Sequence, residues 1–328
     1  MAGGTSGRER GLARMSTISE ASATFKRRAA GMLTRYRSAA PLVVILLAIG
    51  VAAYLVNPET KAAVPSISVV RGVVLVVVGW VAGLLGGLIG TGGCSVMLPA
   101  IHFWMDYPAS MAVGTTLFAV IFTATSGGYG HLVRRNVDRR AVLWLGGGGI
   151  AGVALGSWLF TLLADETELL GLILGLLFLW PAVRMIWQGV IERGMPQHPG
   201  SSITGPAWGL ATFGFAIGVA TGVAGLGGGY ALVPGLIYLF GAPVYVTMGT
   251  SLATMIPLAV VGGGIKLAQG YVAVGAGLLL AVGTVIGAQV GAAVIKRFQP
   301  ATLKLVFGLY FLYVSIKFIT AFAGVKVW

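Results

Sequence analysis

Two glycine-rich stretches carry the residues whose types and spacing suit the binding of an anion. GLLGGLIGTGGCSVMLP occupies residues 83–99, and GVATGVAGLGGGYALVP occupies residues 218–234, 135 positions later without a gap. Each indicates an apolar helix that breaks at glycines and restarts. A restarting helix presents unpaired N–H groups and a partial positive charge, which favour an anion. The candidate ligands are Gly90, Thr91, Gly92, Gly93, Cys94 and Ser95 in the first copy, and Gly225, Gly227, Gly228, Gly229 and Tyr230 in the second.

Hydroxyl side chains follow each stretch at matching positions. Thr115 and Thr116 in the first copy correspond to Thr250 and Ser251 in the second. Their hydroxyls could donate hydrogen bonds to the oxygens of an anion. The alternative is that they bond to the backbone of their own helix or cap it. The residue types support both interpretations equally, and the repetition favours the functional one.

Two basic residues also share one position of the copies, His131 and Lys266. A buried cation would attract an anion. Both residues lie near the ends of predicted helices, where a side chain can extend to the membrane surface. For His131 the surface location is favoured, whereas for Lys266 the surface location and the role of anion ligand are equally favoured.

Carboxylates are absent from the interior of every predicted span. A proton relay of Asp or Glu is therefore not expected, and Asp106→Asn should leave transport intact.

The residues give less support to a disulfide, a reactive thiol, a metal site or an enzyme active site. The single cysteine, Cys94, excludes an internal disulfide and is interpreted as a packing residue rather than a reactive thiol. Three histidines without paired buried carboxylates predict neither a metal site nor a cofactor, and argue against an enzyme. Many of the 52 glycines are expected to let helices pack closely. These are Gly83, Gly87, Gly148, Gly152, Gly156, Gly218, Gly222, Gly283, Gly287 and Gly291.

The composition predicts an all-α polytopic membrane protein. Of 328 residues, 57% are hydrophobic and only 9% are charged, whereas soluble domains carry about a quarter charged residues. Charged residues are absent between Arg71 and Asp106 and between Arg193 and Lys266. The net charge of +13 comes from a tail and from loops, which indicates membrane orientation rather than binding of nucleic acid.

The chain divides into five parts. Residues 1–40 form a basic tail, 41–57 an N-terminal transmembrane helix, 71–190 a first repeat, 191–205 a linker and 206–323 a second repeat. Each repeat is predicted to hold a broken or re-entrant helical hairpin followed by three spanning helices. The predicted helices of the first repeat are 72–89, 94–105, 111–133, 141–163 and 169–189. Those of the second are 206–224, 230–240, 247–268, 272–295 and 301–322.

Loop charges predict that the two repeats have opposite orientations. The loop at residues 134–140 is strongly basic and the loop at 165–168 is acidic, whereas in the second repeat the basic residues flank the later loop. Basic loops tend to stay in the cytoplasm, so we expect an inverted repeat with a cytoplasmic N-terminus. Inverted repeats with broken helices are typical of secondary transporters, whose sites lie near the middle of the membrane.

At GLIGTGGCSVMLP and GVAGLGGGYALVP the sequence resembles the sulfite exporter TauE/SafE family, also called the toluene-sulfonate uptake permease family. The resemblance covers about residues 71–322. It implies movement of small anions such as sulfite, sulfonates and sulfoacetate, in a direction that differs among members. Thr91 and Cys94 stand where the second copy has Leu226 and Gly229, so the two halves of the site are not equivalent.

The sequence therefore predicts a secondary carrier of a small sulfur-containing anion, acting as an exporter in the inner membrane by alternating access. Its partners would be the anion and the lipid bilayer, and coupling to an ion or proton is left open. The alternatives are an anion channel of the same fold, a carrier of small carboxylates, a membrane-embedded enzyme and a structural subunit that binds no anion.

Overall fold

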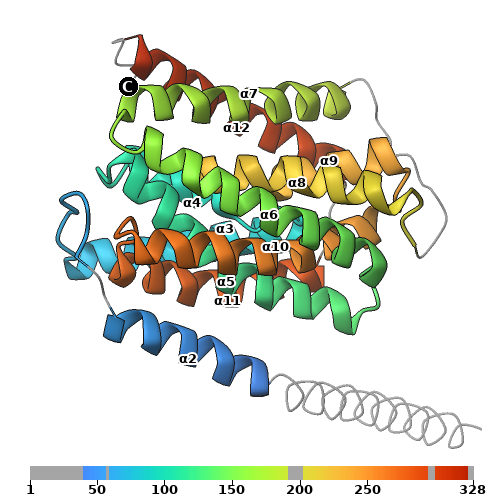
Figure 1. Cartoon of the computed structure of the whole chain (residues 1–328), viewed down its shortest axis with the longest axis horizontal. Helices are drawn as coiled ribbons and strands as arrows, with labels where there is room; N and C mark the ends of the chain where they lie inside the picture. The colour runs from blue at the N-terminus through green and yellow to red at the C-terminus, as the bar shows by residue number, and fades with distance from the viewer. Residues whose placement is uncertain (1–39, 57–58, 191–201, 295–299, 324–328) are drawn as a thin grey trace, which may run out of the picture. The chain divides into compact units, whose positions relative to one another are not determined.

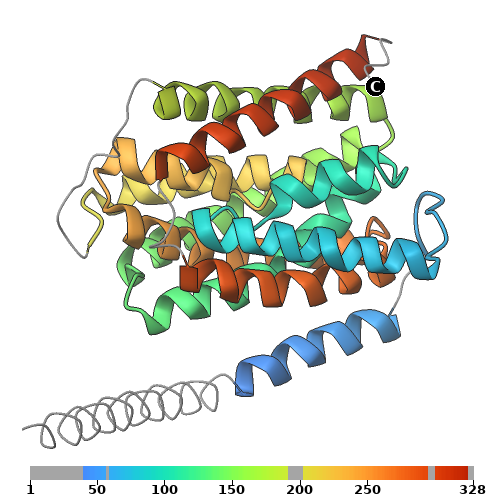
Figure 2. The ribbon, with the colours of Figure 1, turned by 180° about the vertical axis from the view of Figure 1, so that it is seen from behind.

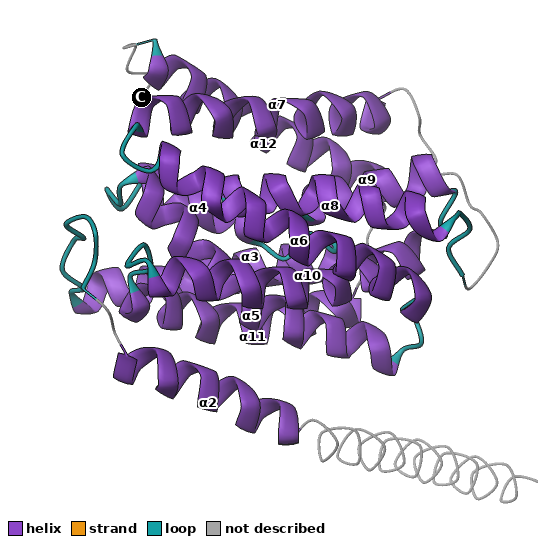
Figure 3. Cartoon of the chain, in the orientation of Figure 1, coloured by secondary structure: helices purple, strands orange, loops and turns teal. Residues whose placement is uncertain are grey.

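A computed structural model describes residues 40–56, 59–190, 202–294 and 300–323. Every regular element in these ranges is a helix (Figures 1 and 3). The predicted basic tail, apart from Ala40, and residues 191–201 of the predicted linker lie outside the described residues. Helix α2 (Ala40–Val56) belongs almost entirely to a separate unit and is described by itself; the remaining helices belong to the unit that begins at Val56.

The predicted helices are confirmed, with shifts of a few residues at their ends. The first repeat contains α3 (Val69–Ile89), α4 (Cys94–Phe103), α5 (Ala109–Val133), α6 (Arg139–Leu163) and α7 (Thr167–Val190). The second contains α8 (Ala207–Ala224), α9 (Gly229–Phe240), α10 (Val244–Ala268), α11 (Val274–Val294) and α12 (Pro300–Phe322). Helices α5 and α10 begin earlier than expected because Pro108 and Pro243 are their N-caps, and proline is well tolerated at a helix start.

Length and composition allow seven of the described helices to cross a membrane: α3, α5, α6, α7, α8, α10 and α11. The second arms of the hairpins are shorter, with 10 residues in α4 and 12 in α9. At 1.5 Å per residue they extend about 15–18 Å, roughly half of a hydrocarbon core. The protein is thus a multi-pass membrane protein with two half-length helices.

Glycines make the closest helix contacts. Helix α3 runs along α11, seen in cyan and orange-red in Figure 2, and α8 packs in the same way against α6. A Cβ atom at Gly83 would lie 2.6 Å from Cα of Thr284, and one at Gly218 would lie 2.9 Å from the nitrogen of Val153. The backbones can approach this closely only because the seams are built from small residues. The expected packing role of these glycines is confirmed.

The two seams use equivalent positions of the repeats. Gly83 on α3 and Gly218 on α8 are 135 residues apart, as are Gly148 on α6 and Gly283 on α11. Each seam therefore joins the first hairpin arm of one repeat to a helix of the other. Helices α5 and α10 also pack on each other, and α7 pairs with α12 along one edge of the bundle (Figure 1). Nearly every residue of α5 is buried, and α5 and α10 pack on the second hairpin arms α4 and α9.

Candidate functional site

Each hairpin turns at three glycines with positive φ. Gly90, Gly92 and Gly93 have φ values of 84°, 74° and 75° before α4, and Gly225, Gly227 and Gly228 have 66°, 65° and 81° before α9. Residues other than glycine rarely adopt this left-handed backbone conformation. The last of these glycines is the N-cap of the next helix, and neither N-cap contributes a side-chain hydrogen bond. The first turns of α4 and α9 therefore start without a side-chain cap.

The two hairpin tips, defined as residues 90–95 and 225–230, lie against each other. All their residues are buried. The Cys94 thiol contacts the carbonyl oxygen of Leu226, and a Cβ atom at Gly229 would lie 2.5 Å from Cα of Thr91. The structure thus brings together the two sets of candidate ligands that the sequence places 135 residues apart.

Two side chains that sequence reasoning missed fill the space beside the tips. A Cβ atom at Gly227 would lie 2.5 Å from the terminal methyl group of Met255 and 3.2 Å from Val120. Gly92 faces the same two side chains. Met255 and Val120 occupy equivalent positions of the repeats. Comparison of the repeats did not reveal them, because the two residue types differ and neither is polar.

The hydroxyl groups predicted beside the site have different partners. The Thr115 hydroxyl accepts a hydrogen bond from the Ala273 amide, and the Thr250 hydroxyl accepts one from the Asp138 amide, both at 2.9 Å. Thr116 donates to the Ala112 carbonyl of its own helix at 2.7 Å, as the structural alternative predicts. Only the fourth, Ser251, reaches a tip.

Ser251 donates to the Gly90 carbonyl oxygen at 2.9 Å. The bond links the start of α10 to the first hairpin, across the boundary between the repeats. Ser251 is thereby a support for the tip in this structure. The roles of all four hydroxyl residues as ligands stay predictions.

Buried hydroxyls without partners occur at both tips. Ser95, in the first turn of α4, is 1% exposed, and its oxygen has no hydrogen-bond partner. Thr221 is fully buried and its oxygen is also unpartnered. A Cβ atom at Gly228, the N-cap of α9, would lie 2.9 Å from that oxygen. Sequence reasoning missed Thr221 because Gly86 stands at the equivalent position.

His131 and Lys266 are both fully buried, so the surface location expected for His131 is wrong, and for Lys266 the surface alternative is excluded. The His131 Nε2 atom lies 3.3 Å from the Gly87 carbonyl oxygen, and the Lys266 ammonium donates to the Gly222 carbonyl at 2.7 Å. The Lys266 nitrogen also lies 3.4 Å from the centroid of the Phe160 ring. Each basic side chain thus meets the last turn of a first hairpin arm, within one turn of a tip.

Asp138 is a structural residue that the loop charges did not reveal. Its carboxylate accepts a hydrogen bond from the Ala141 amide at 3.1 Å and caps α6. It also accepts one from the Ile203 amide at 2.6 Å, in the described part of the predicted linker. Because the Asp138 amide donates to Thr250, this residue joins the linker, α6 and α10 near the site.

We expect Asp106→Asn to leave transport and folding unchanged. Asp106 is exposed and lies between α4 and α5 with φ of 61°. Asparagine adopts this left-handed conformation readily, so the turn is kept while the charge is removed. The check is the initial rate of anion efflux from proteoliposomes. A lower rate in a normally folded variant would show that the carboxylate takes part in transport.

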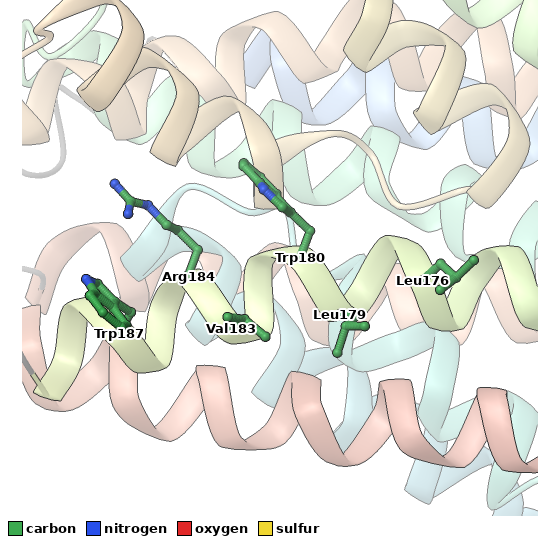
Figure 4. A pocket seen from close by; sticks show the side chains of 6 residues that line it. All are labelled: Leu176, Leu179, Trp180, Val183, Arg184 and Trp187. Atoms are coloured by element: carbon green, nitrogen blue, oxygen red, sulfur yellow. The ribbon is translucent and has the colours of Figure 1, made fainter.

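A surface groove of about 440 Å³ lies away from the tips, lined by residues of α7: Leu176, Leu179, Trp180, Val183, Arg184 and Trp187 (Figure 4). Trp180 and Arg184 project from the same side of the helix, and the Arg184 guanidinium lies 4.5 Å from the centroid of the Tyr238 ring. Trp180 and Trp187 are 57% and 52% exposed. An exposed apolar surface on a spanning helix suits contact with lipid, so we assign it no part in binding the anion.

The chain is similar to a family of membrane transporters. The model of the sulfite exporter TauE/SafE family matches residues 75–318. The probable membrane transporter protein YdhB of Bacillus subtilis is 28% identical over 230 residues, which cover 70% of this chain and 93% of YdhB. The probable membrane transporter protein MJ0441 of Methanocaldococcus jannaschii is 24% identical over 249 residues, covering 70% and 89%. No solved structure matches the chain.

Proposed function

Because the chain belongs to the sulfite exporter TauE/SafE family, we propose that it is a secondary transporter of a small sulfur-containing anion such as sulfite, sulfoacetate or another organosulfonate. We further propose that it exports this anion across the inner membrane, with its N-terminus in the cytoplasm. The basic loop at residues 134–140 supports that orientation. In this proposal the repeats at 71–190 and 206–323 have opposite orientations.

The meeting of the two hairpin tips is the observation that carries the proposal. Two helices, α4 and α9, begin at neighbouring points inside the bundle, and neither has a side-chain cap. The N-terminal amides and the partial positive charge of both helix starts favour an oxyanion. A sulfite or sulfonate group has several acceptor oxygens, so one anion can accept hydrogen bonds from both tips.

The tips must separate for an anion to bind between them. In this structure the thiol of Cys94 contacts the opposite tip, and Met255 packs beside both. The contact thus represents a closed arrangement. Alternating access follows if the hairpins part toward one side of the membrane and then toward the other. The repeat relation supports this, because the first arm of each hairpin packs on a helix of the other repeat.

Ser95 and Thr221 are proposed to donate hydrogen bonds to the anion once the tips part. Both oxygens are buried without a partner, and a buried polar group without a hydrogen bond is costly. The substitutions Ser95→Ala and Thr221→Val remove a hydroxyl that no protein group uses. Each is expected to raise the half-saturating anion concentration about tenfold or more, since a hydrogen bond to a charged group contributes about 1.5–3 kcal/mol.

The measurement is efflux of labelled sulfite, sulfoacetate and sulfate from proteoliposomes. Tyr310→Phe serves as the matched control, because the Tyr310 hydroxyl on α12 is also buried and unpartnered. The control should transport like the wild type. The proposal is wrong if none of the three anions moves. The placement of the anion is wrong if an anion moves but the Ser95 and Thr221 variants saturate at wild-type concentrations.

A further inference from the structure

The two buried basic side chains form a matched pair at the ends of the broken helices. His131 on α5 contacts the carbonyl of Gly87 on α3, and Lys266 on α10 contacts the carbonyl of Gly222 on α8. His131 and Lys266 are 135 residues apart, and so are their two partners. The same contact is therefore made once in each repeat, with an imidazole in one and an ammonium in the other.

Helix geometry explains why a basic group is found there. The last carbonyls of a helix lack partners inside the helix and carry a partial negative charge. Helix α3 ends at Ile89 and α8 at Ala224, so the carbonyls of Gly87 and Gly222 are among these last ones. A basic donor satisfies the carbonyl and stabilises the helix end. Lys266 is this donor in the second repeat.

His131 differs from Lys266 because one of its two ring nitrogens has no partner. A carbonyl oxygen only accepts, so the Nε2 atom must carry the hydrogen that it shares with Gly87. The Nδ1 atom is then a lone-pair acceptor in the neutral ring. It is buried and has no hydrogen-bond partner. A proton that binds there gives the ring a positive charge beside the Gly87 carbonyl.

Charged groups near His131 are few among the described residues. Arg134, the C-cap of α5, donates to the Gly130 carbonyl and is the nearest basic residue along the chain. Titratable side chains on the helices packed against α5 lie elsewhere or have other partners, and α11 has none in its described range. Arg71 on α3 donates to the Ser66 carbonyl, His102 on α4 contacts the Tyr107 carbonyl, and Lys266 on α10 donates to the Gly222 carbonyl. Cys94 on α4 contacts the Leu226 carbonyl, Arg184 on α7 lies over Tyr238, and Glu168 on α7 and Tyr245 on α10 are exposed.

We infer that His131 is the proton-binding residue of the transport cycle, and that a proton taken from water at Nδ1 crosses the membrane in the same direction as the anion. This inference rests on the proposed function. Gly87 precedes the tip residue Gly90 by three positions, or about 5 Å of helix rise. A positive imidazolium at this place and an anion at the tip stabilise each other, so the two bind together. The proton leaves Nδ1 when the anion leaves the tip.

The test uses a pH difference across proteoliposomes while the membrane potential is clamped at zero. One unit, acidic outside, is expected to concentrate labelled sulfoacetate about tenfold inside if one proton accompanies each anion. His131→Gln and His131→Lys each keep a donor for the Gly87 carbonyl, but neither changes its charge during the cycle. Both should reduce the accumulation ratio to about one, while exchange of labelled for unlabelled sulfoacetate at equal pH continues.

His102→Gln is the matched control and should keep the tenfold accumulation, because His102 lies on α4 and contacts Tyr107. The assignment of His131 is wrong if either His131 variant still accumulates sulfoacetate like the wild type. It is also wrong if the wild type exchanges sulfoacetate but does not concentrate it on the alkaline side. In both cases the transporter function stands. If neither sulfoacetate nor sulfite exchanges, the proposed function fails and the proton site fails with it.

Discussion

Alanine at Gly148 is expected to destabilise the protein by about 3 kcal/mol or more, whereas alanine at the adjacent Gly147 is expected to be neutral or stabilising. A Cβ atom at Gly148 would overlap the Ala211 carbonyl oxygen and lie 2.8 Å from the carbonyl carbon. The backbone of α8 cannot yield to it as a flexible side chain could. A Cβ atom at Gly147 would have no other atom within 4 Å. The only expected effect there is the better helix propensity of alanine, which stabilises by up to about 1 kcal/mol.

The second seam provides an independent repetition of this result. Gly283 corresponds to Gly148, and a Cβ atom there would overlap the Val76 carbonyl oxygen and lie 2.5 Å from the nitrogen of Trp80. Gly264→Ala is the control for Gly283→Ala, because a Cβ atom at Gly264 would have no other atom within 4 Å. Thermal unfolding of the detergent-solubilised variants measures all four changes. Equal melting temperatures for Gly147→Ala and Gly148→Ala would contradict the close approach of α6 and α8.

The hairpins were predictable because glycine marks them so strongly. Gly90, Gly92 and Gly93 interrupt an otherwise apolar run, and their positive φ angles are the reason that glycine is required. The repetition at Gly225 strengthened this prediction. Helix ends were predicted less well where proline is the N-cap, as at Pro108, because a proline can equally stand in the preceding loop.

The pairing of helices was not predictable from the repeat. Glycines at intervals of four mark α3, α6, α8 and α11 alike, so the pattern shows which helices can pack closely but not which partner each one takes. The structure pairs α3 with α11 and α6 with α8. That exchange between repeats brings the two tips together. The inverted orientation of the repeats stays a prediction from loop charges.

The burial of His131 and Lys266 could not be predicted from their positions in the chain. Residues near a helix end are often at the membrane surface. The decisive fact is three-dimensional: the last turns of α5 and α10 lie beside the unpaired carbonyls of Gly87 and Gly222. The shared position of the two basic residues was the available signal, and it did not distinguish a ligand from a helix cap.

Gly229→Cys is expected to lower the rate of transport at least about 100-fold, whereas Cys94→Gly should have a much smaller effect. These two residues occupy the same repeat position. The Cys94 side chain already packs against the Leu226 carbonyl. For Gly229→Cys the space for a side chain is occupied, because a Cβ atom at Gly229 would lie 2.5 Å from Cα of Thr91 and 2.6 Å from the Gly90 oxygen. A misplacement of about 1 Å can cost an enzyme 100-fold in rate, and a displaced tip is expected to slow transport to a similar degree.

The double variant Cys94→Gly with Gly229→Cys separates this steric effect from a loss of the thiol. Removing the Cys94 side chain frees volume at the contact between the tips, so the second tip can shift and admit the new side chain. Contacting residues couple in this way, whereas distant ones do not. The double variant should therefore transport faster than Gly229→Cys alone, in the same sulfite or sulfoacetate efflux assay, with thermal unfolding as the check on folding. Strictly additive effects would mean that the two tips do not press on each other when the anion moves, and the closed contact between them would then have no part in the cycle.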